Sequence, residues 1–213
     1  DQMRITRARL FEVRLPLVHR FRTSSHAKST LDHILVELTD DSGVTGWGEI
    51  ASPAGPFYCS ETTETAWPTT IHFLLPAILD ADWDHPEQVD KLWARIRGHE
   101  FAKAGVVGAA WDAWARSRVI TLASALGGRR RKVRAGVSLG IEASIDDLLA
   151  QVERQVEAGY HRVKLKISHG WDIEPVRAVR TAYPQLDLHV DANGVFSSDD
   201  ETIEHLAGLD EFG

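Results

Sequence analysis

The chain has 213 residues, which is enough for one large domain or two small ones. Its net charge of −7 disfavours sequence-independent nucleic-acid binding, because that binding depends on cationic contacts to phosphate. A lone cysteine, Cys59, excludes an intramolecular disulfide and a thiolate zinc cluster, and no stretch approaches the roughly 20 apolar residues of a membrane span. We therefore expect a cytoplasmic protein that binds neither nucleic acid nor membranes.

The first 50 residues are typical of β-strands. An extended segment, Met3 to Val18, precedes two apolar runs over residues 31–39 and 44–50, which flank a turn rich in Asp, Ser and Gly. Apolar runs around such a turn predict a β-hairpin. The glycines near the turn could also suggest a phosphate-binding loop, but no helix beginning with Lys-Ser/Thr follows them. We therefore prefer the hairpin.

Helical patterns dominate the next part of the chain. They cover residues 61–79, 86–98 and 102–126, and we expect the last of them to be interrupted near Ser117. An apolar stripe in the third stretch recurs at helical spacing, so we expect it to form a buried helix face. Its members are Val107, Ala110, Trp111, Trp114 and Ala115.

A basic run, Arg129–Lys132, separates this part from the rest of the chain. An anion-binding patch is one interpretation, but the acidic net charge and the absence of interleaved aromatic residues favour a solvated linker. Beyond the run, strands and helices alternate, which predicts βαβ units and a parallel sheet. The expected strands cover 133–141, 161–167 and 186–190 leading into Asp191, and the expected helices cover 145–158, 175–183 and 198–209.

The second of these strands has an unusual pattern of charges. Its period of two places Lys164 and Lys166 on one face, and Val163, Leu165 and Ile167 on the other. Two lysines pointing into an ordinary parallel sheet covered by helices would be costly. On the inner face of a barrel, near the C-terminal rim, they can instead serve an active site.

The neighbouring strands add polar groups at the same level. Asp191 ends the third strand, Asn193 shares its face, and Ser138 lies in the first strand. Two adjacent ammonium groups repel each other, which lowers a lysine pKa toward that of a general base. A carboxylate one strand away can hold a divalent cation, which stabilises a developing enolate. The alternatives are an exposed edge strand protected by its lysines and an ordinary turn after Asp191.

Several motifs over nearly the whole chain form a recognisable set. They are LPLVHRFRTS (15–24), GWGE (46–49), AGPFYCSET (54–62), FAKAG (101–105), AAWDAWAR (109–116), GVSLGI (136–141), KLKISHGWDIEPVRAVR (164–180) and VDANG (190–194). With this set the chain resembles the muconate-lactonizing subgroup of the enolase superfamily. Within the subgroup it is most similar to the o-succinylbenzoate synthase / N-acylamino acid racemase family.

The resemblance implies a fold and a catalytic centre. Residues 1–130 would form an α+β capping domain, and residues 131–213 would form the first three βα units of a (β/α) barrel. Lys166 matches the family's catalytic lysine, and Lys164 matches the partner that tunes it and touches the substrate carboxylate. Asp191 matches the first carboxylate that binds the divalent metal, which is Mg²⁺ or Mn²⁺.

The resemblance also implies residues that contact the substrate. Ser138 and Asn193 match polar positions of the active site. Phe21 and Tyr58 fall in the two capping-domain loops that close over the substrate, a small carboxylate. The family further implies an oligomer of identical chains.

The implied reaction is metal-dependent abstraction of a proton next to a carboxylate, which gives an enolate. The product would be o-succinylbenzoate, for menaquinone synthesis, the epimer of an N-succinyl or other N-acylamino acid, or both. Dipeptide epimerase and muconate-type cycloisomerase are the alternatives. The chain departs from the family pattern at Ser168-His169-Gly170, at Gly194-Val195-Phe196 and at Glu100-Phe101. The last two departures leave the identity of the substrate open.

The length of the chain limits the barrel. Ser138, Lys166 and Asp191 are spaced 28 and 25 residues apart, so the next strand end would fall at about 216–219, beyond Gly213. A complete barrel typically has about 250 residues and eight strands. We therefore expect a fragment of a longer enzyme that does not bind metal productively by itself. A non-catalytic α/β module is the alternative.

Overall fold

The structure is a computed structural model that describes residues 2–22 and 27–213. The chain divides into two compact units. The first is built from residues 2–16 and 30–130, and the second from 17–22, 27–29 and 131–213. The first two strands of the chain therefore contribute residues to both units.

The first unit contains a four-stranded sheet with the strand order β3-β2-β1-β4. Strand β2 pairs antiparallel with β3, and β1 pairs antiparallel with β4. The predicted hairpin is therefore confirmed, whereas the two-residue strand β4 was not predicted. The strands are β1 (Met3–Arg22), β2 (Ala27–Asp40), β3 (Thr45–Ile50) and β4 (Asp82–Trp83).

The helices of the first unit match the predicted stretches with one clear difference. The second stretch ends at Leu92 rather than at residue 98, because Trp93 leaves the helix and is buried, with its indole N–H donated to the Leu74 carbonyl at 3.1 Å. The break expected near Ser117 is confirmed. The elements are α1 (Thr63–Thr69), the π-helical η1 (Thr70–Leu74), α2 (Leu75–Leu79), the 3₁₀-helical η2 (Pro86–Gln88), α3 (Val89–Leu92), α4 (Glu100–Ser117) and α5 (Leu122–Ala125).

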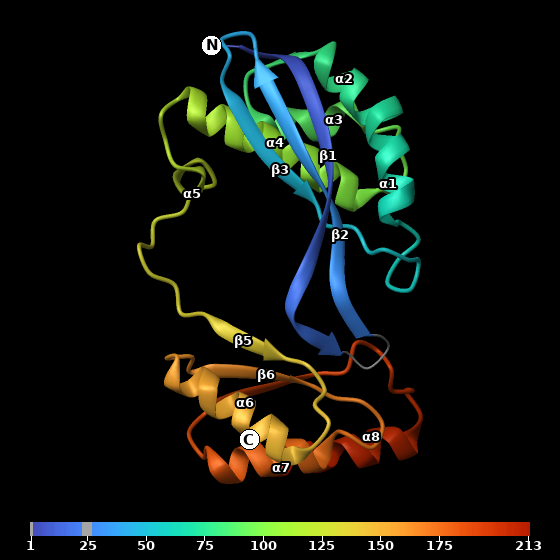
Figure 1. Cartoon of the computed structure of the whole chain (residues 1–213), viewed down its shortest axis with the longest axis vertical. Coiled ribbons are helices and arrows are strands. Elements are labelled where there is room, and N and C mark those ends of the chain that lie inside the picture. Colours follow the sequence, from blue (N-terminus) through green and yellow to red (C-terminus); the bar gives the residue numbers. More distant parts are fainter. Residues whose placement is uncertain (1, 23–26) are drawn as a thin grey trace. The chain divides into compact units, whose positions relative to one another are not determined.

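Helix α4 packs against β3 through small residues (Figure 1). A Cβ added to Gly48 would collide with the backbone of Gly105 in α4, and one added to Gly46 would collide with the backbone of Ala113. These glycines of the GWGE segment therefore allow the helix and the strand to approach each other closely. This role is structural, as the hairpin interpretation expected.

The buried face of α4 differs from the predicted stripe. Trp111 and Trp114 are only partly buried, and both stack edge-on against His85, with ring centroids 5.0 and 4.9 Å from it. Val107 of the predicted stripe is also only partly buried, although it and Trp114 still pack against the core. The close approach to β3 leaves room only for small side chains on the fully buried face. The fully buried face consists of Ala102, Gly105, Val106, Ala109, Ala110, Ala113 and Ala115.

The second unit contains three parallel strands in the order β5-β6-β7, as predicted. Helices α6 and α7 lie on the same side of these strands in Figure 1. The alternation of strand and helix is that of the first βα units of a barrel. The elements are β5 (Gly136–Leu139), α6 (Ile145–Glu157), β6 (Arg162–Lys166), α7 (Ile173–Ala182), β7 (Asp187–Asp191), α8 (Asp200–Ala207) and the 3₁₀-helical η3 (Gly208–Phe212).

The core of this unit explains why the two faces of β6 differ. Val163, Leu165 and Ile167 are at most 3% exposed and belong to one apolar cluster with residues of α6 and α7. Because successive side chains alternate between faces, packing these residues against the helices directs the intervening lysines to the opposite face. The helix partners in the cluster are Leu148, Val152, Val176 and Val179.

Candidate active site

Lys164, Lys166 and Asp191 form one charged cluster at the C-terminal ends of β6 and β7. The Lys166 and Lys164 ammonium groups lie 2.7 and 2.9 Å from the same carboxylate oxygen, Oδ2 of Asp191. Parallel pairing produces this contact, because Lys166 lies directly opposite Asp191 in the register of the two strands. The prediction that all three side chains share one face is confirmed.

Asn193 completes the cluster. Its side-chain Oδ1 accepts a hydrogen bond from Lys166 Nζ at 2.7 Å, and its backbone N–H donates to Asp191 Oδ1 at 3.0 Å. Asn193 and the following Gly194 have φ angles of 50° and 72°, so the chain turns back immediately after β7. Asparagine and glycine tolerate this left-handed conformation better than other residues, which accounts for both at this turn.

Burial and charge distinguish the members of the cluster. The Lys166 side chain is 8% exposed, whereas those of Asp191 and Lys164 are 27% and 39% exposed. Hydrogen bonds from Lys166, Lys164 and the Asn193 N–H hold the pKa of Asp191 well below its usual range. Two cations face one anion, so the cluster has an excess positive charge that suits an anionic ligand.

Ser138 and Phe21, two further predicted site residues, both belong to the second unit. Ser138 is exposed on β5, directly opposite Lys164, and its hydroxyl has no hydrogen-bond partner in the described part of the chain. Phe21 is partly buried at the end of β1. The next residue, Arg22, accepts a hydrogen bond from the N–H of Ile141, in the loop after β5, at 2.9 Å.

Tyr58 belongs to the first unit, whereas Phe21 and the lysines belong to the second. Its side chain is strongly exposed, at 73%, and its ring meets Phe101 edge-on at 6.4 Å. The structure thus brings together the four polar residues at the ends of β6 and β7. The roles predicted for Ser138, Phe21 and Tyr58 stay predictions.

One contact near the cluster was not predicted as a site feature. The imidazole of His169, in the loop after β6, meets the Phe196 ring at 4.5 Å between centroids. Its Nε2 lies 3.2 Å from the Val195 carbonyl oxygen. We call these residues the His169–Phe196 clasp, because they join the loop after β6 to the loop that carries Asn193. The signal for it was in the sequence, where both loops depart from the family pattern.

The strand-end cluster contains oxygen atoms that could bind a divalent metal ion. Within residues 2–22 and 27–213, no three His, Cys, Asp or Glu side chains gather at a spacing that would hold an ion. The cluster offers one carboxylate, Asp191, and one amide oxygen, on Asn193. Mg²⁺ prefers hard oxygen ligands, commonly one or two carboxylates completed by other oxygens. The donors therefore fit such a cation in kind.

Among the helices that the structure describes, none combines the length and the apolar character needed to cross a bilayer.

Two family profiles match the chain. Residues 5–127 match the profile "Mandelate racemase / muconate lactonizing enzyme, N-terminal domain", and residues 147–213 match "Enolase C-terminal domain-like". The chain belongs to the mandelate racemase / muconate lactonizing enzyme family of the enolase superfamily, with the fold of its capping domain and the first part of its barrel.

Individual proteins of this family are similar to the chain over almost its whole length. The chain is 40% identical to an o-succinylbenzoate synthase from Geobacillus kaustophilus, covering 96% of this chain and 54% of the relative. It is also 40% identical to an N-succinylamino acid racemase from Amycolatopsis sp, covering 99% and 57%. A solved enolase-superfamily member from Listeria innocua Clip11262 superposes with a TM-score of 0.92 at 36% identity, covering 99% and 56%. The chain thus spans about half the length of the relatives it matches.

Proposed function

We propose that this protein is an enzyme that removes the proton next to a substrate carboxylate and so forms an enolate. The observation that carries the proposal is the contact of Lys164 and Lys166 with a single Asp191 oxygen at the strand ends. Parallel (β/α) barrels place their catalytic groups at this end of the strands. An arrangement of two lysines and one carboxylate supplies a base, a positive charge and a ligand for a cation.

Each residue has a distinct role in the proposal. Lys166, when neutral, accepts the α-proton at Nζ, and the amide oxygen of Asn193 orients that nitrogen. Lys164, on the same face of β6, attracts the substrate carboxylate through its ammonium group. Asp191 would hold the divalent cation, with Mg²⁺ or Mn²⁺ as the proposed metal. A bound cation stabilises negative charge that develops on the substrate.

The remaining assignments belong to the same proposal. Residues 1–130 form the capping domain, and residues 131–213 begin the barrel. Ser138 contacts the substrate from β5, and Phe21 and Tyr58 close over it from the capping domain. We propose a cytoplasmic enzyme that is an oligomer of identical chains in its full length.

The names of the relatives support two reactions. One is o-succinylbenzoate synthesis, in which the enolate loses water, and the other is racemisation of an N-succinyl or other N-acylamino acid, in which the α-carbon is protonated on the opposite face. Menaquinone synthesis is the proposed context for the first. Dipeptide epimerisation is a weaker candidate, since an L-Ala-D/L-Glu epimerase from Bacillus subtilis is 26% identical.

The experiment that tests the proposal is an assay of proton exchange. The protein encoded by the complete gene is incubated with Mg²⁺ and an N-succinylamino acid in deuterated water, and loss of the α-proton signal is followed by NMR. o-Succinylbenzoate formation is measured in parallel, and an L-Ala-L-Glu dipeptide serves as the alternative substrate. We expect exchange on the N-succinyl substrate, synthesis, or both. Exchange confined to the dipeptide, or absent throughout, would contradict the proposal.

The same assay on the 213-residue chain separates the enzyme from a non-catalytic module. We expect this chain to be inactive alone, because it offers a single carboxylate at the cluster. Activity at the level of the complete protein would show that the chain is sufficient.

A further inference from the structure

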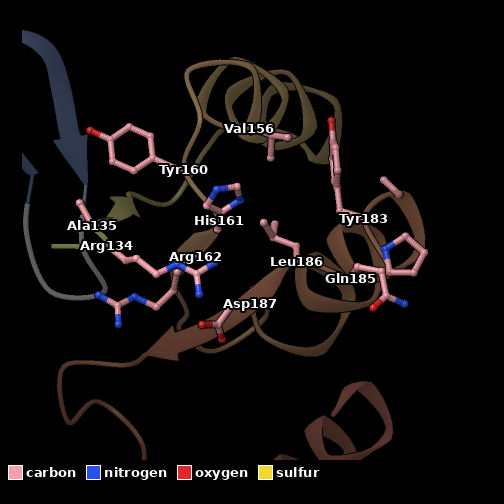
Figure 2. A pocket seen from close by; sticks show the side chains of 12 residues that line it. Arg134, Ala135, Val156, Tyr160, His161, Arg162, Tyr183, Gln185, Leu186 and Asp187 are labelled. Carbon is pink, nitrogen blue, oxygen red and sulfur yellow. The ribbon is translucent and has the colours of Figure 1, made fainter. Parts of the chain in front are cut away.

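The second unit contains a pocket of about 770 Å³ that the proposed chemistry does not use. It lies where β5, β6 and β7 begin, whereas Lys166 and Asp191 lie where β6 and β7 end. Figure 2 shows Arg134 on one side of the pocket and Tyr183 on the other. The lining residues are Arg134, Ala135, Val156, Tyr160, His161, Arg162, Ala182, Tyr183, Pro184, Gln185, Leu186 and Asp187.

The charged groups of this pocket are unbalanced. Within the part of the chain that the structure describes, the side chains of Arg134, Arg162 and His161 have no ion-pair or hydrogen-bond partner. Asp187 is the single acidic residue of the lining, and it lies 3.4 Å from the imidazole of His189. Two permanently charged guanidinium groups therefore face the pocket against one carboxylate. In a protein of net charge −7, this is a locally basic site.

One part of the pocket wall is aromatic and aliphatic. The rings of Tyr160 and Tyr183 approach it from the ends of α6 and α7, and Leu186 lies between the two sides in Figure 2. Burial and the carboxylates of Glu153 and Glu157 raise the pKa of Tyr183. Its hydroxyl therefore remains protonated and neutral, so it can donate a hydrogen bond to an anion, and neither Glu153 nor Glu157 lines the pocket.

We propose that this pocket binds a small organic anion with a flat body and two acidic groups, of the class of the aromatic dicarboxylates. Its volume falls in the range of about 300–1,000 Å³ that is typical of small-molecule sites. Arginine binds carboxylates through two parallel hydrogen bonds. Arg134 lies just before β5 and Arg162 begins the neighbouring strand β6, so there is one arginine for each acidic group. The tyrosine rings and Leu186 cover the body of the ligand. This proposal does not depend on the proposed reaction.

The test is calorimetric titration of the complete protein with phthalate, with neutral phthalamide as the matched ligand. The titration uses a Lys166→Ala variant in EDTA, so that binding at the strand-end cluster does not contribute. We expect phthalate to bind in a one-to-one ratio and phthalamide not to bind. Because each charged hydrogen bond that is lost weakens binding by about tenfold, Arg134→Gln and Arg162→Gln should each raise Kd by roughly that factor.

Two further variants make the outcome decisive. Arg154→Gln removes an exposed arginine of α6 that does not line the pocket, so it should leave Kd unchanged. Asp187→Asn removes the one acidic group of the lining, so it should tighten phthalate binding by several-fold. Should Arg162→Gln not fold, Arg134→Gln remains informative, because Arg134 is exposed and precedes β5. No phthalate binding, or binding that responds equally to all four substitutions, would overturn the proposal.

Discussion

Each unit contains a carboxylate that is surrounded by cations, and the two arrangements differ in a way that separates structure from chemistry. In the first unit, both oxygens of Glu37 accept hydrogen bonds from Arg9, at 2.8 and 2.7 Å, and the Glu37 side chain is 4% exposed. In the second unit, one oxygen of Asp191 is shared by two lysines. The first is a bidentate pair, and the Arg7 guanidinium lies 3.8 Å from the same carboxylate.

The identity of the cation explains what each arrangement can do. A guanidinium does not lose its proton in a protein, so Arg9 cannot act as a base. An ammonium can lose its proton when its surroundings change, so Lys166 can act as a base. A charged cluster in a fold is therefore more informative about catalysis when its cations are lysines that compete for one acceptor.

The largest expected effect tests this difference directly. In the complete protein, Lys166→Ala should abolish exchange of the substrate α-proton, because loss of a positioned general base typically costs roughly 10²–10⁴-fold in rate. Arg9→Gln is the matched control, since it also removes a cation from a carboxylate, and it should leave the exchange rate unchanged. Both rates are measured by NMR in deuterated water. Exchange at the wild-type rate in Lys166→Ala would mean that another residue is the base.

The second prediction concerns the close contact of α4 with β3. Gly105→Ala should destabilise the protein by about 1–3 kcal/mol or more, because its Cβ would meet the backbone of Ile50 and Glu49. Gly108→Ala is the control in the same helix, because its Cβ would make only an ordinary contact with Gly48. There the gain in helix propensity should stabilise the protein by up to about 1 kcal/mol. Urea unfolding that gives equal stability changes for the two variants would contradict this packing.

The sequence alone predicts those elements whose signals lie within a few neighbouring residues, and it misses features that depend on contacts between residues far apart in the chain. The second unit was predicted element by element, because a signal such as the period of two in residues 162–166 acts locally. The first unit was less predictable. The early end of α3 depends on a bond from Trp93 to a carbonyl 19 residues away, and no local pattern contains that contact.

The candidate site shows the same limit. Alternation along β6 and β7 was enough to place Lys164, Lys166 and Asp191 on one face. It could not indicate that both lysines would reach the same oxygen, because this requires the register of the two strands. The His169–Phe196 clasp joins two loops, whose conformation follows no periodic pattern, so its contacts could not be derived from spacing.

Replacing the Asp191 carboxylate should lower activity by weakening metal binding. Asp191→Asn should weaken Mg²⁺ binding to the complete protein by at least about tenfold, since even partners outside the first ligand shell cost that much. Activity should recover in part at high Mg²⁺ or Mn²⁺. Calorimetric titration with the metal checks the first statement, and the circular dichroism spectrum checks that the fold is intact. An unchanged metal affinity would show that Asp191 is not a ligand.

The clasp should have a moderate effect on turnover. Phe196→Leu removes the ring that meets His169, which frees the loop that positions Asn193 against Lys166. We expect kcat to fall by about tenfold with little change in KM, because small displacements of catalytic groups are costly. Phe196→Tyr keeps the ring and should retain the wild-type kcat. Equal loss in both variants would argue against a positioning role.

The smallest effect is on the acid dependence of stability. The hydrogen bonds from Arg9 hold the pKa of Glu37 below its usual value, so the pair stabilises the fold fully above the unfolded pKa of about 4.3. This contribution is lost as the pH falls through the lower pKa of the folded state, because the unfolded chain then binds more protons. Arg9→Gln moves the pKa of Glu37 back up, so it should lower stability at pH 7 and reduce the loss between pH 7 and acid.

Part of the acid dependence should survive in this variant. Asp32, beside Arg14, and Asp191, beside its lysines, also have lowered pKa values, and Arg9→Gln leaves both carboxylates paired. Urea unfolding at a series of pH values measures the slope, and an NMR titration of Glu37 measures its pKa directly. If Arg9→Gln leaves the slope unchanged while the Glu37 pKa rises, the unfolded state must hold a comparable interaction, and the pair would not be the satisfied structural contact that distinguishes the first unit from the second.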